Sequence, residues 1–145
     1  MPAHCTGVGK ALLAYSPRPV VDRYLESGLP RCTGASISTA AALEASLARI
    51  RDTGYAVERD EAVPGVACVA APILLGDAPL AAVAVCGPSR RVDVDELRHR
   101  VMWTAAEISR RHAAADRPAP VSSGHCPGQR KGAGRARPEP ATIRA

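Results

Sequence analysis

Two β-prone runs separated by a turn sequence constrain the fold of this chain more than any other feature. Residues 66–75 and 80–86 are rich in Val, Leu and Ala, and the segment 76–79 between them contains Gly, Asp and Pro. Because Gly and Pro favour turns between strands, this pattern predicts a β-hairpin. Both strands are almost continuously apolar and rich in small residues. This predicts a sheet covered by helices on one side, with a close-packed or ligand-binding surface on the other.

Three helices are expected before the hairpin, over residues 6–15, 16–27 and 39–53. Thr6 is a suitable N-cap for the first helix, and Pro17 fits the first helical position of the second. One face of the third helix should be buried, because apolar side chains recur there at helical spacing in Leu43, Leu47 and Ile50. Gly54 should end that helix. A short strand at residues 55–58 and a loop at 60–65 should then lead into the hairpin.

The last helix is the best-marked element of the sequence. Asp93 is a good N-cap, and Glu96 stands three residues later, as in a capping box. The basic residues near its end favour the negative end of the helix dipole. Its buried stripe is expected to consist of Leu97, Val101, Ala105 and Ile108.

Composition and charge divide the chain near residue 115. The 145 residues contain 3% aromatics and no Phe, so the core must be aliphatic and its stability modest for the length. Residues 1–115 carry 13 basic and 12 acidic side chains, whereas residues 116–145 carry 6 and 2. The second segment is also rich in Pro and Gly. We therefore expect one folded domain over 1–115 and a disordered basic tail over 116–145.

Several classes of protein are disfavoured by the sequence. It has no apolar run of about 20 residues, as a membrane span requires, and its first residues do not resemble a signal peptide. The five cysteines are scattered and odd in number, which is typical of reduced thiols in the cytoplasm. The basic tail is better explained as a solvated extension than as a nucleic-acid contact, because it lacks aromatic residues and a recognition helix.

Four motifs in this chain resemble those of the IclR family of bacterial transcriptional regulators. They are PAHCTGVGKALLA at residues 2–14, RIRDTGYA at 49–56, EAVPGVACVAAPI at 61–73 and VAVCGP at 83–88. Their order and spacing agree with the family over about residues 2–112. The resemblance implies an α+β, GAF-like or profilin-like effector-binding domain, in which helices flank an antiparallel sheet that is here incomplete at its N-terminus.

The family resemblance also implies partners. Such domains bind a small molecule, usually a carboxylate-bearing metabolite, and build dimers and tetramers. DNA binding in the family belongs to an N-terminal winged helix-turn-helix domain, which we expect to be absent from this chain. An incomplete sheet would leave an exposed edge that favours association. No enzymatic activity, metal or cofactor is implied.

The ligand-binding positions implied by the resemblance are Gly7, Val8, Glu58, Val66, Cys68, Ala84 and Cys86. The first two stand at a helix start, where free backbone amides favour a carboxylate. Family members that bind very small acids have serines at the positions of Ala84 and Cys86. Their replacement predicts a less polar pocket that suits longer or aromatic acids. The competing interpretation is that Cys68, Ala84 and Cys86 are ordinary small core residues.

Other chemistries remain as alternatives. The segment Gly7–Lys10 does not fit a phosphate-binding loop, because His4 and Ala11 stand where that motif needs Gly and Ser or Thr. Lys10 should instead face solvent or a local carboxylate. A metal site formed by His4 and Cys5 with Cys68 or Cys86 is a further alternative, but no ligand spacing in the sequence supports it. The second functional hypothesis is a free-standing cytoplasmic protein that binds or converts a small molecule without any link to DNA.

Overall fold

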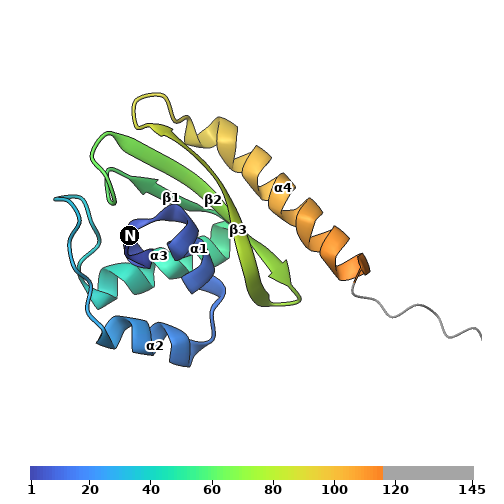
Figure 1. Ribbon diagram of the computed structural model, residues 1–145, viewed down its shortest axis with the longest axis horizontal. Helices are drawn as coiled ribbons and strands as arrows, with labels where there is room; N and C mark the ends of the chain where they lie inside the picture. Colours follow the sequence, from blue (N-terminus) through green and yellow to red (C-terminus); the bar gives the residue numbers. More distant parts are fainter. Residues whose placement is uncertain (116–145) are drawn as a thin grey trace, which may run out of the picture.

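The computed structural model describes residues 1–115; residues 116–145, where the sequence predicts a disordered tail, lie outside the described residues. The elements are η1 (Ala3–Cys5), α1 (Gly7–Tyr15), α2 (Arg18–Glu26), α3 (Ala40–Thr53), β1 (Ala56–Arg59), β2 (Val66–Leu75), β3 (Ala78–Pro88) and α4 (Val94–Ala115). This is an α+β fold, as predicted, with the sheet between α4 on one side and the other helices on the opposite side (Figure 1). No helix in this described part is long and apolar enough to cross a membrane.

The central strand β2 lies antiparallel to both β1 and β3. Its alternate side chains enter two different cores. One core joins α4 to Ala67, Val69, Ala71 and Ile73 of β2. The other joins α1 and α3 to Ala70. The predicted antiparallel sheet flanked by helices is confirmed, and the expected close-packed second side is also formed by helices, because helices cover both faces of the sheet (Figure 1). This double cover explains why β2 is apolar at nearly every position.

The hairpin turn is tighter than the sequence predicted. β2 ends at Leu75 and β3 begins at Ala78, so only Gly76 and Asp77 form the turn. Gly76 has a φ of 61°, a left-handed conformation that glycine adopts without a Cβ penalty. β3 is consequently longer at both ends than expected and continues to Pro88.

The first two helices meet at a sharp junction. Thr6 caps α1 as predicted, because its Oγ1 accepts a hydrogen bond of 3.0 Å from the Gly9 amide. The predicted start of α2 was wrong, since that helix begins at Arg18. Ser16 serves as the C-cap of α1, and Pro17 is extended, with a ψ of 144°. Pro17 is therefore the N-cap of α2 rather than its first helical residue.

The third helix follows its sequence pattern closely. Leu43, Leu47 and Ile50 are all buried, and they join the core formed with α1. Gly54 ends α3 with a φ of 82° and donates its amide to the Ile50 carbonyl. The predicted buried face and C-terminal glycine are both confirmed.

The start of α4 is capped by Asp93, as predicted. Its Oδ1 accepts hydrogen bonds from the amides of Asp95 and Glu96, at 2.9 and 3.2 Å. Glu96 does not return the contact in a capping box. Its carboxylate pairs instead with Arg100, at 3.0 Å, which lies one helical turn further along α4.

The buried stripe of α4 differs from the prediction at one position. Val101 and Ala105 are buried, but Ile108 is 39% exposed. Ser109 contacts the sheet instead, because its Oγ accepts a hydrogen bond of 2.9 Å from the Leu74 amide. The side chains of α4 that face the sheet therefore recur every four residues, at Val101, Ala105 and Ser109. The prediction was wrong in placing Ile108, three residues after Ala105, on this face.

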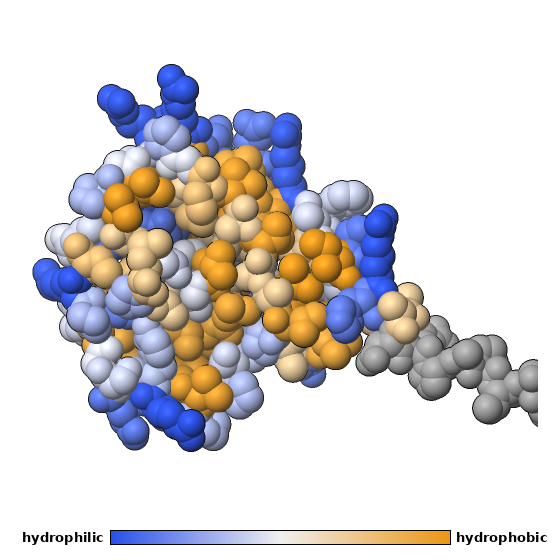
Figure 2. All heavy atoms as spheres, in the orientation of Figure 1, coloured by the Kyte–Doolittle hydropathy of each residue, from blue (hydrophilic) through white to orange (hydrophobic). Residues whose placement is uncertain are grey.

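The outer strand β3 carries apolar side chains that the described fold leaves uncovered. Leu80 is 50% exposed and Val85 is 42% exposed. Figure 2 shows apolar atoms gathered across the middle of the face on which Figure 1 places β3. Since β3 is at the edge of the described three-stranded sheet, its outer backbone groups are available to another strand.

Candidate ligand-binding site

A cavity of about 290 Å³ lies where the start of α1 meets the sheet. Its lining comes from the residues before α1, from α1 and the three strands, and from the loop between β1 and β2. It consists of Met1, Thr6, Gly7, Val8, Glu58, Ala62, Val63, Val66, Cys68 and Cys86. Six of the seven predicted ligand-binding residues therefore meet in one place. They are separated by up to about 80 positions in the sequence, and the hairpin register brings the last two together.

The amides at the start of α1 form the polar end of this cavity. The Gly9 amide donates a hydrogen bond to the Thr6 side chain, and the Lys10 amide donates one to the Thr6 carbonyl. Among residues 1–115, the amides of Gly7 and Val8 donate no hydrogen bond to the rest of the fold. These two N–H groups stand at the positive end of the helix dipole, where a carboxylate is stabilised.

Glu58 supplies a carboxylate to the cavity wall and also organises the adjacent loop. It is only 3% exposed. Its Oε1 accepts hydrogen bonds from the amides of Glu61 and Ala62, at 2.8 and 3.2 Å. Within the described residues, its Oε2 has no such partner. The side chain is thus held in place through one oxygen, and the other can contact a bound molecule.

Two cysteines lie opposite one another on the sheet side of the cavity. Cys68 on β2 pairs with Cys86 on β3 in the strand register. Cys68 is buried and Cys86 is exposed. Burial raises the pKa of the Cys68 thiol to about 12, aided by a hydrogen bond with Cys86 and the charges of Cys86 and Glu58, while Lys10 opposes the shift. Cys68 is therefore a neutral thiol at physiological pH, and this wall of the cavity is weakly polar.

A buried ion pair lies behind the start of α1. The Lys10 Nζ is 2.6 Å from Glu61 Oε1, and the lysine side chain is 1% exposed. Of the two predicted orientations of Lys10, the contact with a carboxylate is confirmed and the solvent-facing one is wrong. Because its charge is already neutralised by Glu61, Lys10 is not a free anion-binding group.

His4 has a structural role in the same region. Its Nδ1 lies 2.7 Å from the Tyr24 hydroxyl, and its Nε2 lies 3.1 Å from the Pro30 carbonyl oxygen. Both ring nitrogens are therefore used within the fold. Within residues 1–115, no group of three or more metal-ligating side chains is assembled, so the metal hypothesis built on His4 and Cys5 has no support in the geometry.

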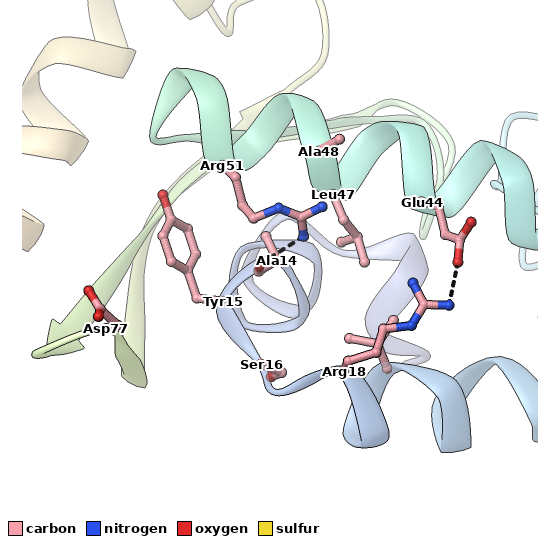
Figure 3. A pocket seen from close by; sticks show the side chains of 10 residues that line it. Ala14, Tyr15, Ser16, Arg18, Glu44, Leu47, Ala48, Arg51 and Asp77 are labelled. Atoms are coloured by element: carbon pink, nitrogen blue, oxygen red, sulfur yellow. Dashed lines mark hydrogen bonds and ion pairs between the residues drawn. The ribbon is translucent and has the colours of Figure 1, made fainter.

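A larger cavity of about 640 Å³ lies elsewhere, between α1, α3 and the hairpin tip. Its two arginines are already engaged. Figure 3 shows Arg51 reaching the Ala14 carbonyl oxygen, at 3.0 Å, and Arg18 reaching Glu44, at 2.9 Å. The hydrogen bond with Glu44 and the charge of Asp22 raise the pKa of Arg18. Since these cations are paired, this cavity has fewer free hydrogen-bond donors for a carboxylate ligand than the start of α1 has.

The remaining predicted residue, Ala84, lies outside the cavity lining. It is half-buried against the core formed with α1, directly opposite Ala70. Four residues that line the cavity had not been predicted: Met1, Thr6, Ala62 and Val63. Thr6 adjoins the predicted amides, and the 60–65 loop follows Glu58 directly, so both had an indirect sequence signal. Met1 had none.

The family of this chain follows from comparison with known sequences. A family model described as "Bacterial transcriptional regulator IclR C-terminal" matches residues 1–110. The chain belongs to the IclR family. Its fold is that of the family's C-terminal domain, and the predicted resemblance is confirmed over nearly all of the described residues.

Individual IclR-family proteins support the same assignment. The HTH-type transcriptional regulator BhcR of Paracoccus denitrificans (strain Pd 1222) is 38% identical over 112 residues, covering 73% of this chain and 40% of BhcR. The Thermotoga maritima IclR structure has a TM-score of 0.70 and 32% identity, covering 77% of this chain and 47% of that one. The PobR inducer-binding domain from Acinetobacter, a double mutant complexed with 3-hydroxybenzoic acid, has a TM-score of 0.69 and 29% identity. That match covers 75% of this chain and 66% of the solved inducer-binding domain.

This IclR-family chain therefore spans less than half the length of BhcR. It corresponds to the effector-binding part of a transcriptional regulator. The alternative of a free-standing catalytic or binding protein without a link to transcription is not favoured, because the matching relatives are named as transcriptional regulators.

Proposed function

We propose that this domain binds a small carboxylate in the 290 Å³ cavity, and that binding controls transcription by the regulator of which the domain is part. The supporting observation is that one cavity combines a polar end with an apolar wall. The unengaged amides of Gly7 and Val8 suit the carboxylate. The side chains of Val66, Cys68 and Cys86 suit an apolar body attached to it.

The wall chemistry favours a longer or aromatic acid over a very small keto acid. The sheet side of the cavity offers the thiols of Cys68 and Cys86 and the side chain of Val66 rather than hydroxyls, so the apolar part of the ligand contributes the binding energy. The second oxygen of Glu58 accepts a hydrogen bond from a hydroxyl or ammonium group of the ligand, and it repels a second carboxylate. The PobR complex names 3-hydroxybenzoic acid, and this molecule has the acid, the ring and the hydroxyl that our proposal requires.

Calorimetric titration of the 145-residue chain tests this proposal. We expect 3-hydroxybenzoate to bind more tightly than pyruvate. The variant Cys86→Leu should fill the cavity and weaken binding at least about tenfold, which corresponds to about 1.4 kcal/mol. Val20→Leu is the control, because Val20 is exposed on α2 and lies outside the cavity lining. Equal binding by wild type, Cys86→Leu and Val20→Leu would move the site elsewhere.

The proposal includes the partners that act with a ligand. Regulators of the IclR family bind small-molecule effectors and act as oligomers on DNA. We propose that this chain self-associates through β3, where Leu80 and Val85 are exposed. Light scattering should then show an assembly in wild type that Leu80→Lys reduces. We further propose that DNA is contacted only through a winged-helix domain outside these 145 residues, so these residues alone should give no sequence-specific mobility shift.

The proposal assigns no catalytic residue and no cofactor, since the named relatives are regulators rather than enzymes. Control of transcription places the proposed site of action in the bacterial cytoplasm. It also implies that the amount of bound ligand, rather than its turnover, is the quantity that this domain reports.

A further inference from the structure

The two thiols in the cavity wall have a relationship that ligand binding does not require. Cys68 and Cys86 face one another across β2 and β3, one buried and the other exposed. Antiparallel strands contain two kinds of directly opposed pair, and only their backbone hydrogen bonds distinguish them. The kind of pair decides how closely two opposed side chains approach.

Backbone contacts identify the kind of pair that the cysteines form. The Ser89 amide donates to the Gly65 carbonyl at 2.8 Å, just beyond the end of the ladder. Counting inward, hydrogen-bonded pairs alternate with non-hydrogen-bonded ones, so the pairs that contain Pro88 and Pro72 are of the second kind. This agrees with proline, which has no amide hydrogen to exchange. The Cys68–Cys86 pair is an even number of residues from both proline pairs, so it is also a non-hydrogen-bonded pair.

A non-hydrogen-bonded pair brings its two residues close enough for a disulfide. The Cα atoms of such pairs lie about 4.5 Å apart, within the range of about 4.4–6.8 Å found across disulfides. Both thiols are free, and the neighbouring Cys86 is among the causes that raise the pKa of Cys68. The Sγ of Cys68 also lies against Gly7, where a Cβ would be 3.4 Å away, which limits its freedom to turn elsewhere.

We propose that Cys68 and Cys86 are a reversible oxidation site, at which a low-molecular-weight disulfide of the glutathione type converts the two thiols into a cross-strand disulfide. This site is independent of the proposed ligand binding, because the reaction needs no ligand. It would connect the wall of the cavity to the thiol–disulfide balance around the protein.

The reaction proceeds in two exchange steps, and the accessible thiol acts first. The Cys86 thiolate attacks one sulfur of oxidised glutathione, which forms a mixed disulfide on Cys86 and releases one glutathione thiolate. The Cys68 thiol then loses its proton to solvent and attacks the Cys86 sulfur. The cross-strand disulfide forms and the second glutathione leaves as a thiolate, which takes up a proton. In total, two protein thiols are oxidised and one disulfide is reduced to two thiols.

Removal of the first thiol also assists the second step. While Cys86 is free, its hydrogen bond and charge both raise the pKa of Cys68. Once Cys86 is in a mixed disulfide, these two contributions are gone, whereas burial, the largest cause of the raised pKa of Cys68, remains. The attacking sulfur is already beside its target, which replaces a bimolecular step with an intramolecular one.

Peptide mapping of the full chain after incubation with oxidised glutathione tests the proposal directly. Trypsin leaves both cysteines on the peptide 60–90, which contains no internal Lys or Arg. Cleavage before Asp77 then separates Cys68 from Cys86 unless a disulfide joins the halves. Cys5, Cys32 and Cys126 fall on other tryptic peptides. We expect the two halves to stay linked, with the loss of two hydrogen atoms, and to separate after treatment with dithiothreitol.

The matched variant Cys68→Ser keeps the accessible thiol and removes its partner. It should accumulate glutathione on Cys86, whereas the wild type should show this adduct only transiently. A lasting adduct in the wild type, unmodified thiols, or a link from Cys86 to any other cysteine would each overturn the proposal. Failure of 3-hydroxybenzoate to bind would overturn the proposed function alone, since the mapping is done without a ligand.

Discussion

Lys10 on α1 and Glu61 in the loop before β2 form an ion pair of 2.6 Å between side chains that are 1% and 13% exposed. They are 51 positions apart in the sequence. The pair joins the helix whose first amides face the cavity to the loop that supplies another part of its lining. Glu61 Oε2 is buried without a hydrogen-bond partner among the described residues, so the carboxylate depends strongly on Lys10.

Removing one member of this pair should therefore be costly. We expect Lys10→Met to lower the free energy of unfolding by about 3–5 kcal/mol, because it leaves the Glu61 charge buried without a partner. The double variant Lys10→Met with Glu61→Leu should recover much of that loss, since both charges are then absent. Urea denaturation of the wild type, both single variants and the double variant measures the effect. Additive losses would show that the two groups are not coupled.

Gly9 is expected to tolerate no side chain, because α1 approaches the segment before it very closely. A Cβ at Gly9 would lie 2.3 Å from the Ala3 carbonyl oxygen, and backbone cannot move aside as a flexible side chain can. Gly9→Ala should destabilise the fold by about 1–3 kcal/mol through this overpacking. Gly34→Ala is the control, since no atom of the described residues lies within 4 Å of a Cβ there. Thermal unfolding should separate the two variants clearly.

The local parts of the fold could be predicted from sequence because each rests on nearby residues. The Thr6 cap, the buried face of α3 and the Gly54 terminus depend on contacts within a few positions. The cover on both faces of β2 could not be distinguished from a single cover, because small apolar side chains fit either environment. The sequence also left two orientations for Lys10, solvent or a local carboxylate, because a lysine next to a glycine-rich turn does not indicate its partner.

The candidate site was predicted mainly through the family motifs, which place distant residues together without a structure. Glu58, Val66 and Cys68 meet in the cavity because of the β1–β2 pairing, and no spacing rule in the sequence reveals that pairing. Ala84 shows the limit of this transfer. It shares the face of Cys86 on β3 but packs against the α1 core, because β3 passes beyond the end of the cavity.

The thiol of Cys68 should make the stability of the fold depend on pH in the alkaline range. Burial raises its pKa from 9.0 to about 12 in the folded chain. Between these values the unfolded chain has released the proton and the folded chain has not, so stability falls as the pH rises through this window. Below pH 9 the contribution is fully present. Urea midpoints for wild type and Cys68→Ala, measured across this window, should show a steeper decline in the wild type; parallel curves would argue against the raised pKa.

Ser109 should stabilise the contact between α4 and the end of β2 through a single hydroxyl. Its Oγ donates to the Ala105 carbonyl and accepts from the Leu74 amide, both at 2.9 Å. Ser109→Ala leaves that amide without its partner, and we expect a loss of about 1–3 kcal/mol. Thr104→Ala is the matched control, because within residues 1–115 the Thr104 hydroxyl bonds only to the Arg100 carbonyl of its own helix. Amide hydrogen exchange gives the sharper readout. Leu74 should lose protection in Ser109→Ala and keep it in Thr104→Ala, whereas equal protection in both would mean that the hydroxyl does not hold the strand to the helix.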